Sequence, residues 1–187
     1  MKTEHSPAAA DRFLSLLRPI ETDLERYCRR MIWDEHEVAD AIQNAVLRAY
    51  RAFDRYHDDA SFRAWMFKIL TNEIFSVNRK RGRIARFEVP LDAEEMDDFA
   101  ELVSAAAETF SSWETLADAL DEDILRALQA LNEAERAVLL LRAIGDLRYR
   151  EISECLDIPL GSVMGNLFRA RQKMRGALVG KRGRRSP

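Results

Sequence analysis

Five cations gather within eight residues in the first half of the chain, a spacing that suits a nucleic-acid backbone. They are Arg79, Lys80, Arg81, Arg83 and Arg86. Together they can neutralise several phosphates. Trp65, Lys68 and Asn72 lie along one flank of the helix expected to lead into this cluster. Aromatic faces stack on unpaired bases for about 1–3 kcal/mol each, so the pattern predicts a track for single-stranded DNA.

The polar loop before this helix, residues 54–61, could enclose a base swung out of the duplex. Its candidate contact residues are Asp54, Arg55, Tyr56, His57 and Ser61. A purely structural interpretation stands beside this one. In it Trp65 belongs to the core, and the cations only complement the C-terminal end of a helix dipole. For Trp65 the sequence favours the core interpretation.

The C-terminal region has the pattern of a helix-turn-helix. A short helix is expected over 149–156, a turn with proline and glycine at 157–161, and then a longer helix capped by Ser162. The inward positions of that helix are Val163, Leu167, Ala170, Met174 and Leu178. The opposite face, which a major groove would meet, holds Ser162, Gly165, Asn166, Arg169, Gln172 and Lys173. An ordinary helical hairpin with solvated charges remains the alternative.

An outward leucine in the second expected helix indicates a face for another protein. Asp40, Gln43, Asn44, Leu47 and Arg51 share the side that points away from the apolar stripe. A single exposed leucine is common in soluble proteins. Here, hydrogen-bonding side chains flank it at three- and four-residue spacing, which suits a helix that docks on a partner.

Helices are expected to position all three groups. Apolar residues recur at three- and four-residue spacing almost throughout, and no long alternation typical of strands appears. The fold class predicted is all-α. In the first half, apolar stripes run over 13–31, 38–53 and 62–77, with a bend expected at Pro19, and three such helices can close one core. In the second half a stripe over 124–141, which includes Leu125, precedes the helix-turn-helix.

An acidic strap separates the two helical lobes. No Lys or Arg occurs from residue 87 to 125, and this window holds thirteen of the 32 acidic residues. The remainder carries all 29 basic residues against 19 acidic ones, so the net charge of −3 hides two basic lobes. The strap is too polar to form much structure of its own and is expected to be a flexible linker.

Several classes of protein and site are excluded at this level. Cys28 and Cys155 lie far apart among apolar neighbours, which predicts buried thiols and no disulfide framework. His5, His36 and His57 lack the spacing of metal ligands and are expected at the surface. No apolar run reaches the ~18 residues of a membrane span, and no secretory signal is present, so a cytoplasmic protein is expected.

The sequence resembles an extracytoplasmic-function sigma factor, the smallest group of the sigma-70 family. In the first lobe the matching blocks cover 38–43, 48–53 and 62–72, and they lead into the cations at 79–81. In the second lobe they cover 131–136, 149–152, 158–163 and 168–171. Each block alone is weakly specific, whereas their order and spacing together are specific. The chain departs from the family pattern at Met164-Gly165-Asn166 and in the charged segment 34–37.

The resemblance implies a protein that is not an enzyme, has no cofactor or metal, and takes no small-molecule substrate. It implies that Asp40, Gln43, Asn44, Leu47 and Arg51 bind the clamp helices of one large subunit of core RNA polymerase. The second lobe would rest on the flap of the other large subunit. Asn72 and the loop at 54–61 would hold a flipped base of the promoter minus-ten element. Residues implied at the minus-thirty-five element are Tyr149, Arg150, Ser162, Gly165, Asn166, Arg169, Arg171 and Lys173. An anti-sigma factor is a further implied partner.

The expected domains are a sigma-two domain at 8–86, the acidic linker at 87–117, a sigma-four helix-turn-helix domain at 118–180 and a disordered basic tail at 181–187. The runner-up function is a stand-alone helix-turn-helix regulator, in which the first lobe senses a ligand or dimerises and the protein binds promoter duplex without polymerase. A helical scaffold or metal-carboxylate enzyme is more remote, because the ligand spacing is missing.

Overall fold

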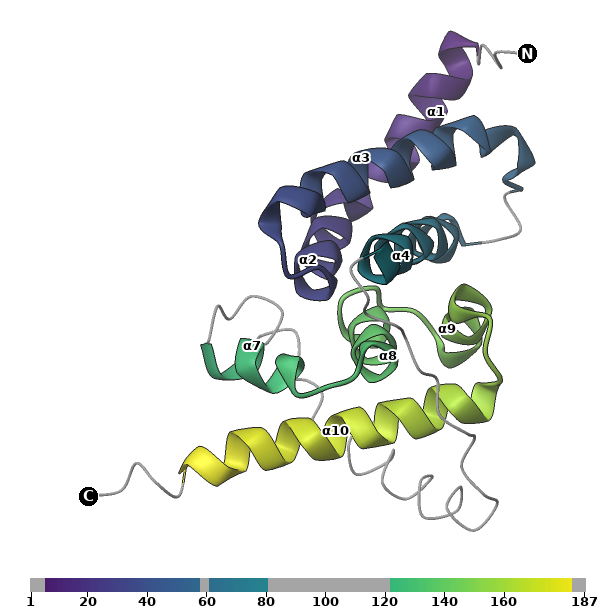
Figure 1. Cartoon of the computed structure of the whole chain (residues 1–187). Coiled ribbons are helices and arrows are strands. Elements are labelled where there is room, and N and C mark those ends of the chain that lie inside the picture. Colours follow the sequence, from purple (N-terminus) through teal and green to yellow (C-terminus); the bar gives the residue numbers. More distant parts are fainter. Residues whose placement is uncertain (1–5, 58–60, 81–121, 183–187) are drawn as a thin grey trace. The chain divides into compact units, whose positions relative to one another are not determined.

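The computed structural model describes residues 6–57, 61–80 and 122–182, and over these ranges the chain forms helices and no strand (Figure 1). The chain divides into two compact units: unit 1 is Met1–Ile84 and unit 2 is Ala85–Pro187. The predicted all-helical fold is therefore confirmed. The strap at 87–117 and the last residues of the tail, 183–187, lie outside the described residues.

The first helix of unit 1 is interrupted where proline was expected to bend it. Helix α1 (Pro7–Leu17) gives way to a 3-10 turn, η1 (Arg18–Ile20), and α2 (Glu21–Met31) follows. Pro19 lies inside this turn and has no backbone N–H to donate to the preceding turn. Figure 1 shows α1 and α2 as two segments joined there.

Helix α3 (Glu35–Arg51) explains the charged segment that departs from the family pattern. Asp34 is its N-cap, and the Asp34 carboxylate accepts a hydrogen bond from the backbone N–H of His36 at 3.0 Å. Glu35 and Glu37 lie in the first turn. Negative charge is favourable at this end because the helix dipole is positive there. These acidic residues therefore start a helix.

Helix α4 (Phe62–Lys80) follows a short 3-10 turn, η2 (Phe53–Arg55), and packs against α2 and α3. A buried polar contact lies within this packing. The hydroxyls of Tyr27 and Thr71 are 2.9 Å apart, and Thr71 donates to the carbonyl of Phe67 at 2.7 Å. Tyr27 and Phe67 are both fully buried, with ring centroids 5.4 Å apart in an edge-on arrangement. Satisfied buried hydroxyls of this kind favour one arrangement of the helices over others.

In the described part of unit 2, the first two helices are α7 (Glu122–Gln129) and α8 (Glu133–Ala143). A reciprocal capping box begins α8: Glu135 N–H donates to Asn132 Oδ1 at 2.8 Å, and Asn132 N–H donates to Glu135 Oε2 at 3.0 Å. Leu128 and Leu131 are buried as expected, whereas Leu125 is 37% exposed. The apolar stripe of α7 is therefore only partly covered by the rest of the unit.

Helix α9 (Tyr149–Leu156) has the bounds that the sequence predicted. It ends at Asp157, which adopts the left-handed conformation with φ 55° and ψ 48°, a conformation that aspartate tolerates better than most residues. Helix α10 (Leu160–Arg182) follows and packs against α7, α8 and α9. It ends at Arg182, two residues into the segment expected as a tail.

Both cysteines are buried free thiols, as predicted. Burial raises the pKa of Cys28 to about 12, so its thiol stays protonated and unreactive at neutral pH. His36 and His57 are exposed, also as predicted, and His5 lies outside the described residues. Over the described part of the chain, no helix is long and apolar enough to cross a membrane.

We expect Gly145→Ala to destabilise unit 2. A Cβ at this position would lie 2.6 Å from the backbone carbonyl oxygen of Leu141, so the turn after α8 would have to shift. The free energy of unfolding should fall by roughly 1–3 kcal/mol. The control is Gly176→Ala, because a Cβ there meets nothing within 4 Å and alanine favours a helix by about 0.5–1 kcal/mol. Urea denaturation of both variants measures the two effects. Equal stabilisation by the two alanines would contradict the steric argument.

Candidate nucleic-acid and protein interfaces

The outer side of α3 is the expected protein-binding face, and its exposure is confirmed. Asp40, Gln43, Asn44, Leu47 and Arg51 are all exposed, and Leu47 is 45% exposed. The opposite side buries three alanines at four-residue spacing, Ala41, Ala45 and Ala49. A leucine held outward among polar side chains can contribute an apolar contact to a partner without being needed by the core.

A salt bridge that the sequence did not reveal joins this helix to α4. Arg48 Nη1 lies 3.1 Å from Glu73 Oε2, and the Glu73 side chain is only 8% exposed. Removing the guanidinium would leave a buried carboxylate without its charged partner. The pair therefore helps to fix the α3 face relative to the exposed face of α4. In the sequence, the only sign of this salt bridge was an acidic residue, Glu73, among the apolar positions of the helix.

The loop before α4 begins on an aromatic cluster. The rings of Tyr56 and Phe53 are stacked, with centroids 5.8 Å apart. Trp65 lies 5.3 Å from the Tyr56 ring and 5.7 Å from the Phe62 ring, and it is half-buried. Trp65 therefore packs on the core with part of its ring, as the structural interpretation predicts, and remains partly accessible, as stacking on a base would require.

The loop itself is described only at its ends. Asp54, Arg55, His57 and Ser61 are exposed, and residues 58–60 lie outside the described residues. Ser61 accepts a hydrogen bond from the backbone N–H of Ala64 at 3.2 Å, which starts α4. The described ends of the loop are therefore exposed, except for Tyr56, which is half-buried against Trp65.

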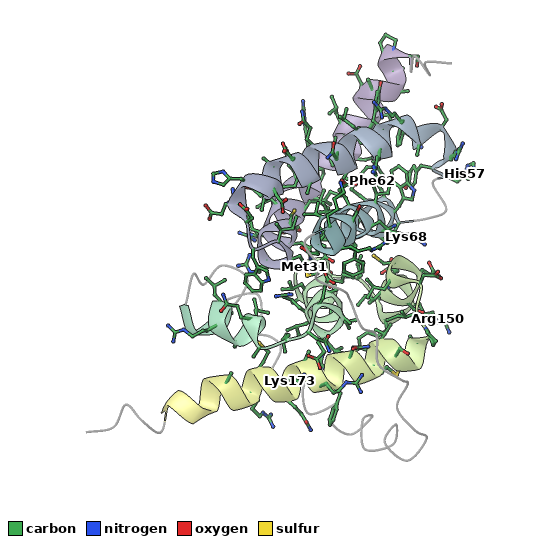
Figure 2. All side chains as sticks on the ribbon, in the orientation of Figure 1. Met31, His57, Phe62, Lys68, Arg150 and Lys173 are labelled. Atoms are coloured by element: carbon green, nitrogen blue, oxygen red, sulfur yellow. The ribbon has the colours of Figure 1, made fainter. Side chains whose placement is uncertain are left out.

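The predicted nucleic-acid flank of α4 is at the surface. Lys68, Asn72, Arg79 and Lys80 are exposed, and Figure 2 labels Lys68 on this helix and His57 in the preceding loop. Arg81, Arg83 and Arg86 lie outside the described residues. Along α4 the described part of the flank therefore offers an aromatic ring, an amide and three cations, the groups that suit an unpaired strand.

The helix-turn-helix of unit 2 differs from its prediction at the turn. Helix α10 begins at Leu160, so Ser162 lies inside its first turn and is not its cap. Pro159 fits the start of a helix, because it needs no backbone donor there. Its carbonyl accepts hydrogen bonds from the N–H groups of Ser162 at 3.0 Å and Val163 at 3.2 Å.

Half of the face expected to meet DNA is buried. Ser162 is 4% exposed, Asn166 is 0% exposed and Gly165 is also buried. Burial of Asn166 is partly compensated, because its amide nitrogen donates to the backbone carbonyl of Ser162 at 2.7 Å. The predicted outward orientation of these three residues was wrong. Val163, Leu167, Ala170 and Met174 are buried as predicted, and Gln172 and Lys173 are exposed.

Two of the predicted DNA-binding cations have partners within unit 2. Arg171 is half-buried, and burial lowers its pKa while the charge and hydrogen bond of Tyr149 act in the opposite direction. Lys173 Nζ lies 2.7 Å from Glu135 Oε1. Arg169 is half-buried, and Arg150 is exposed on the first turn of α9 (Figure 2).

No group of His, Cys, Asp and Glu side chains within the described ranges could hold a metal ion. The exposed faces of α3 and α4 and the helix-turn-helix present groups suited to recognition, and these three surfaces are the candidate sites.

Comparison with known protein families gives two matches along the chain. The family model for sigma-70 region 2 matches residues 16–84, and the model for sigma-70 region 4 matches residues 121–174. The ECF RNA polymerase sigma-E factor of Escherichia coli strain K12 is 31% identical over 138 residues, which cover 73% of this chain and 71% of that protein. The RNA polymerase sigma-H factor of Pseudomonas aeruginosa strain PAO1 is 30% identical over 153 residues, 80% of this chain and 77% of that protein.

Solved structures share the fold. The sigma factor RpoE, crystallised with the anti-sigma factor NepR from Bartonella quintana, superimposes with a TM-score of 0.67 at 20% identity and covers 90% of this chain and 97% of its own. CnrH, solved with the cytosolic domain of CnrY, gives a TM-score of 0.61 at 23% identity over 90% of this chain and 88% of that chain.

The burial within α10 can be tested by thiol labelling. Ser162→Cys should react slowly with a maleimide in the native protein, because residue 162 is buried, whereas Gln172→Cys on the same helix should react at the rate of an exposed thiol. The native thiols of Cys28 and Cys155 are buried and give a low background. Mass spectrometry of timed samples measures both rates. Equal labelling of positions 162 and 172 would show that residue 162 faces outward, as the sequence predicted.

Proposed function

The chain belongs to the extracytoplasmic-function group of the sigma-70 family and directs promoter-specific initiation of transcription, and from this premise we propose how its own residues divide that work. The observation that carries the proposal is the order of parts in one chain. A helical unit with an exposed leucine-bearing face on α3 and a basic flank on α4 precedes a helix-turn-helix unit. A duplex-reading module alone would not need the first unit.

The outer face of α3 is the proposed docking surface for core RNA polymerase. Leu47 supplies the apolar contact, and Asp40, Gln43, Asn44 and Arg51 supply polar contacts around it. Such an arrangement, an apolar anchor with a polar rim, is typical of specific interfaces. We propose that this face meets the clamp helices of one large subunit, and that unit 2 rests on the flap of the other.

The flank of α4 is the proposed site for the opened minus-ten element. Asn72 and the loop around Tyr56 hold a base that has left the stack, and Trp65 offers a ring for stacking. Arg79 and Lys80, with Arg81 and Arg83 beyond them, track the phosphates. Recognition of an unpaired base makes binding and strand opening parts of one event, because the contact exists only after the duplex has opened.

The helix-turn-helix is the proposed reader of the minus-thirty-five element. Arg150 starts α9, and Arg169 lies on α10, where an arginine can make a bidentate contact to guanine worth about 1–3 kcal/mol of discrimination. Tyr149 and Arg171 contribute from the seam between the two helices. With Ser162, Gly165 and Asn166 buried, the proposed reading surface is smaller than the sequence suggested.

We further propose that the sigma-two domain covers 8–86 and the sigma-four domain 118–180, with the acidic segment at 87–117 as the linker. A polyanion of this kind can lie in a positively charged channel of the polymerase until nascent RNA displaces it. The protein is proposed to work in the cytoplasm without catalytic activity of its own. An anti-sigma factor is proposed as its regulator, supported by the neighbour RpoE, which was crystallised with one.

The sigma-factor function and the alternative of a stand-alone regulator predict different behaviour with core RNA polymerase. Purified protein mixed with core RNA polymerase should form a stable holoenzyme and give a specific transcript from promoters selected out of a randomised library. No ligand or covalent modification should be needed. Specific binding to promoter duplex without polymerase, together with no transcript from the mixture, would favour the regulator.

Leu47→Asp should weaken the binding of core polymerase by roughly 30-fold or more, which corresponds to about 2 kcal/mol for an apolar anchor. Its melting temperature should hardly change, because exposed substitutions usually alter stability by about 0.5 kcal/mol or less. Leu14→Asp is the matched control, since Leu14 is 44% exposed on α1, outside the proposed face. Gel filtration with core enzyme and thermal melts give the two readouts. Equal loss of binding in both variants would remove the assignment of this surface.

Neutralising Arg79 and Lys80 together should weaken all promoters alike and reduce the slope of log affinity against log salt by roughly 0.7–0.9 per lost phosphate contact. Asn72→Ala should behave differently, because a base pocket acts only after the base leaves the stack. Closed complexes of this variant should form normally and strand opening should fall. Salt titration of the holoenzyme and permanganate footprinting separate the two effects. An Asn72→Ala variant with normal footprints would exclude Asn72 from the pocket that holds the flipped base.

A further inference from the structure

Glu135 and Lys173 form an ion pair that joins the first turn of α8 to the middle of α10. Lys173 Nζ donates to both carboxylate oxygens of Glu135, at 2.7 and 2.8 Å. The Glu135 side chain is 0% exposed, whereas that of Lys173 is 46% exposed. The lysine is therefore partly exposed, while its ammonium group binds a carboxylate that has no contact with solvent.

The carboxylate of this pair is itself held in place. Its Oε2 also accepts the backbone N–H of Asn132 at 3.0 Å, and the Glu135 N–H donates to Asn132 Oδ1 at 2.8 Å. Glu135 thus has no freedom to follow Lys173 if α10 rotates or slides. A cation on α10 that binds a carboxylate fixed at the start of α8 constrains the orientation of α10 on its support.

We propose that Glu135 and Lys173 are positioning residues for promoter reading, and that Lys173 is not a phosphate contact. The inference rests on the proposed function of α10. Glu135 is fully buried and cannot touch DNA, so any effect it has on base preference must pass through the placement of α10. The charge of Lys173 is already compensated by that carboxylate, so it contributes little to the release of counterions on binding.

Four variants separate positioning from phosphate contact. Glu135→Gln removes the charge but keeps an oxygen that can accept from Asn132. Lys173→Arg keeps a cation that can pair with the carboxylate. The double variant Glu135→Gln with Lys173→Gln removes both charges and leaves no unpaired buried ion. Arg175→Gln is the control, because it removes an exposed cation from the same helix.

The measurement uses holoenzyme assembled with core polymerase. Its probes are a promoter duplex selected from a randomised library and the same duplex with a substituted upstream element. Affinity for each is measured across a salt series, and thermal melts of each free variant report folding. The ratio of the two affinities reports base reading, and the salt slope reports phosphate contacts.

We expect Glu135→Gln and the double variant to lower the affinity ratio by about fivefold or more, the factor that corresponds to ~1 kcal/mol and to the loss of one weak base contact. The salt slope of the double variant should match that of the wild type. Lys173→Arg should keep the wild-type ratio, and Arg175→Gln should change neither the ratio nor the melting temperature.

A salt slope reduced by roughly 0.9 in the double variant would show that Lys173 contacts a phosphate and would overturn the inference. An unchanged affinity ratio in both Glu135→Gln and the double variant would overturn it as well, because the pair would then have no effect on reading. Failure of the proposed function gives a distinct result: wild-type holoenzyme would show no upstream preference at all.

Discussion

The close packing of α3 against α4 is the contact on which the first unit depends. Ala41, Ala45 and Ala49 form a ridge of small side chains at four-residue spacing, and each is at most 1% exposed. Small residues on this ridge let the neighbouring helices approach closely. The binding groups of both helices lie on the sides left exposed. The Arg48–Glu73 salt bridge and the Tyr27–Thr71 contact then restrict how α4 can slide or rotate, so two surfaces for different partners are held in a fixed relation.

The second unit uses polar contacts in a similar way around α10. This helix lies against α7, α8 and α9, and the charged side chains that the sequence offered for DNA are partly engaged inside the unit. Lys173 binds Glu135, and Arg171 interacts with Tyr149. The buried carboxylate of Glu135 strongly disfavours arrangements that leave it without its cation. The pair therefore disfavours misplacement of α10, and a fixed placement of this helix is what DNA reading requires.

Prediction from the sequence succeeded where a single periodic pattern decided the outcome. The bend at Pro19, the bounds of α9, the outward position of Leu47 and the exposure of Lys68 and Asn72 follow from residue spacing or from the chemistry of proline. It failed for Ser162 and Asn166. Short polar side chains can lie on either side of a helix, because a backbone carbonyl of the same helix can replace water as the acceptor for an amide N–H, as the Ser162 carbonyl does for Asn166.

The amino-acid sequence by itself determined the all-helical class, the segregation of charge into two basic lobes around an acidic strap, and the family. These properties depend on composition, on local periodicity and on the order of motifs, which need no knowledge of what lies opposite each residue. Only the tertiary structure decided which cations remain at the surface. The contact between Lys173 and Glu135 joins residues 38 positions apart, and no local pattern specifies such a pair, because the partner is brought close only when α8 and α10 pack.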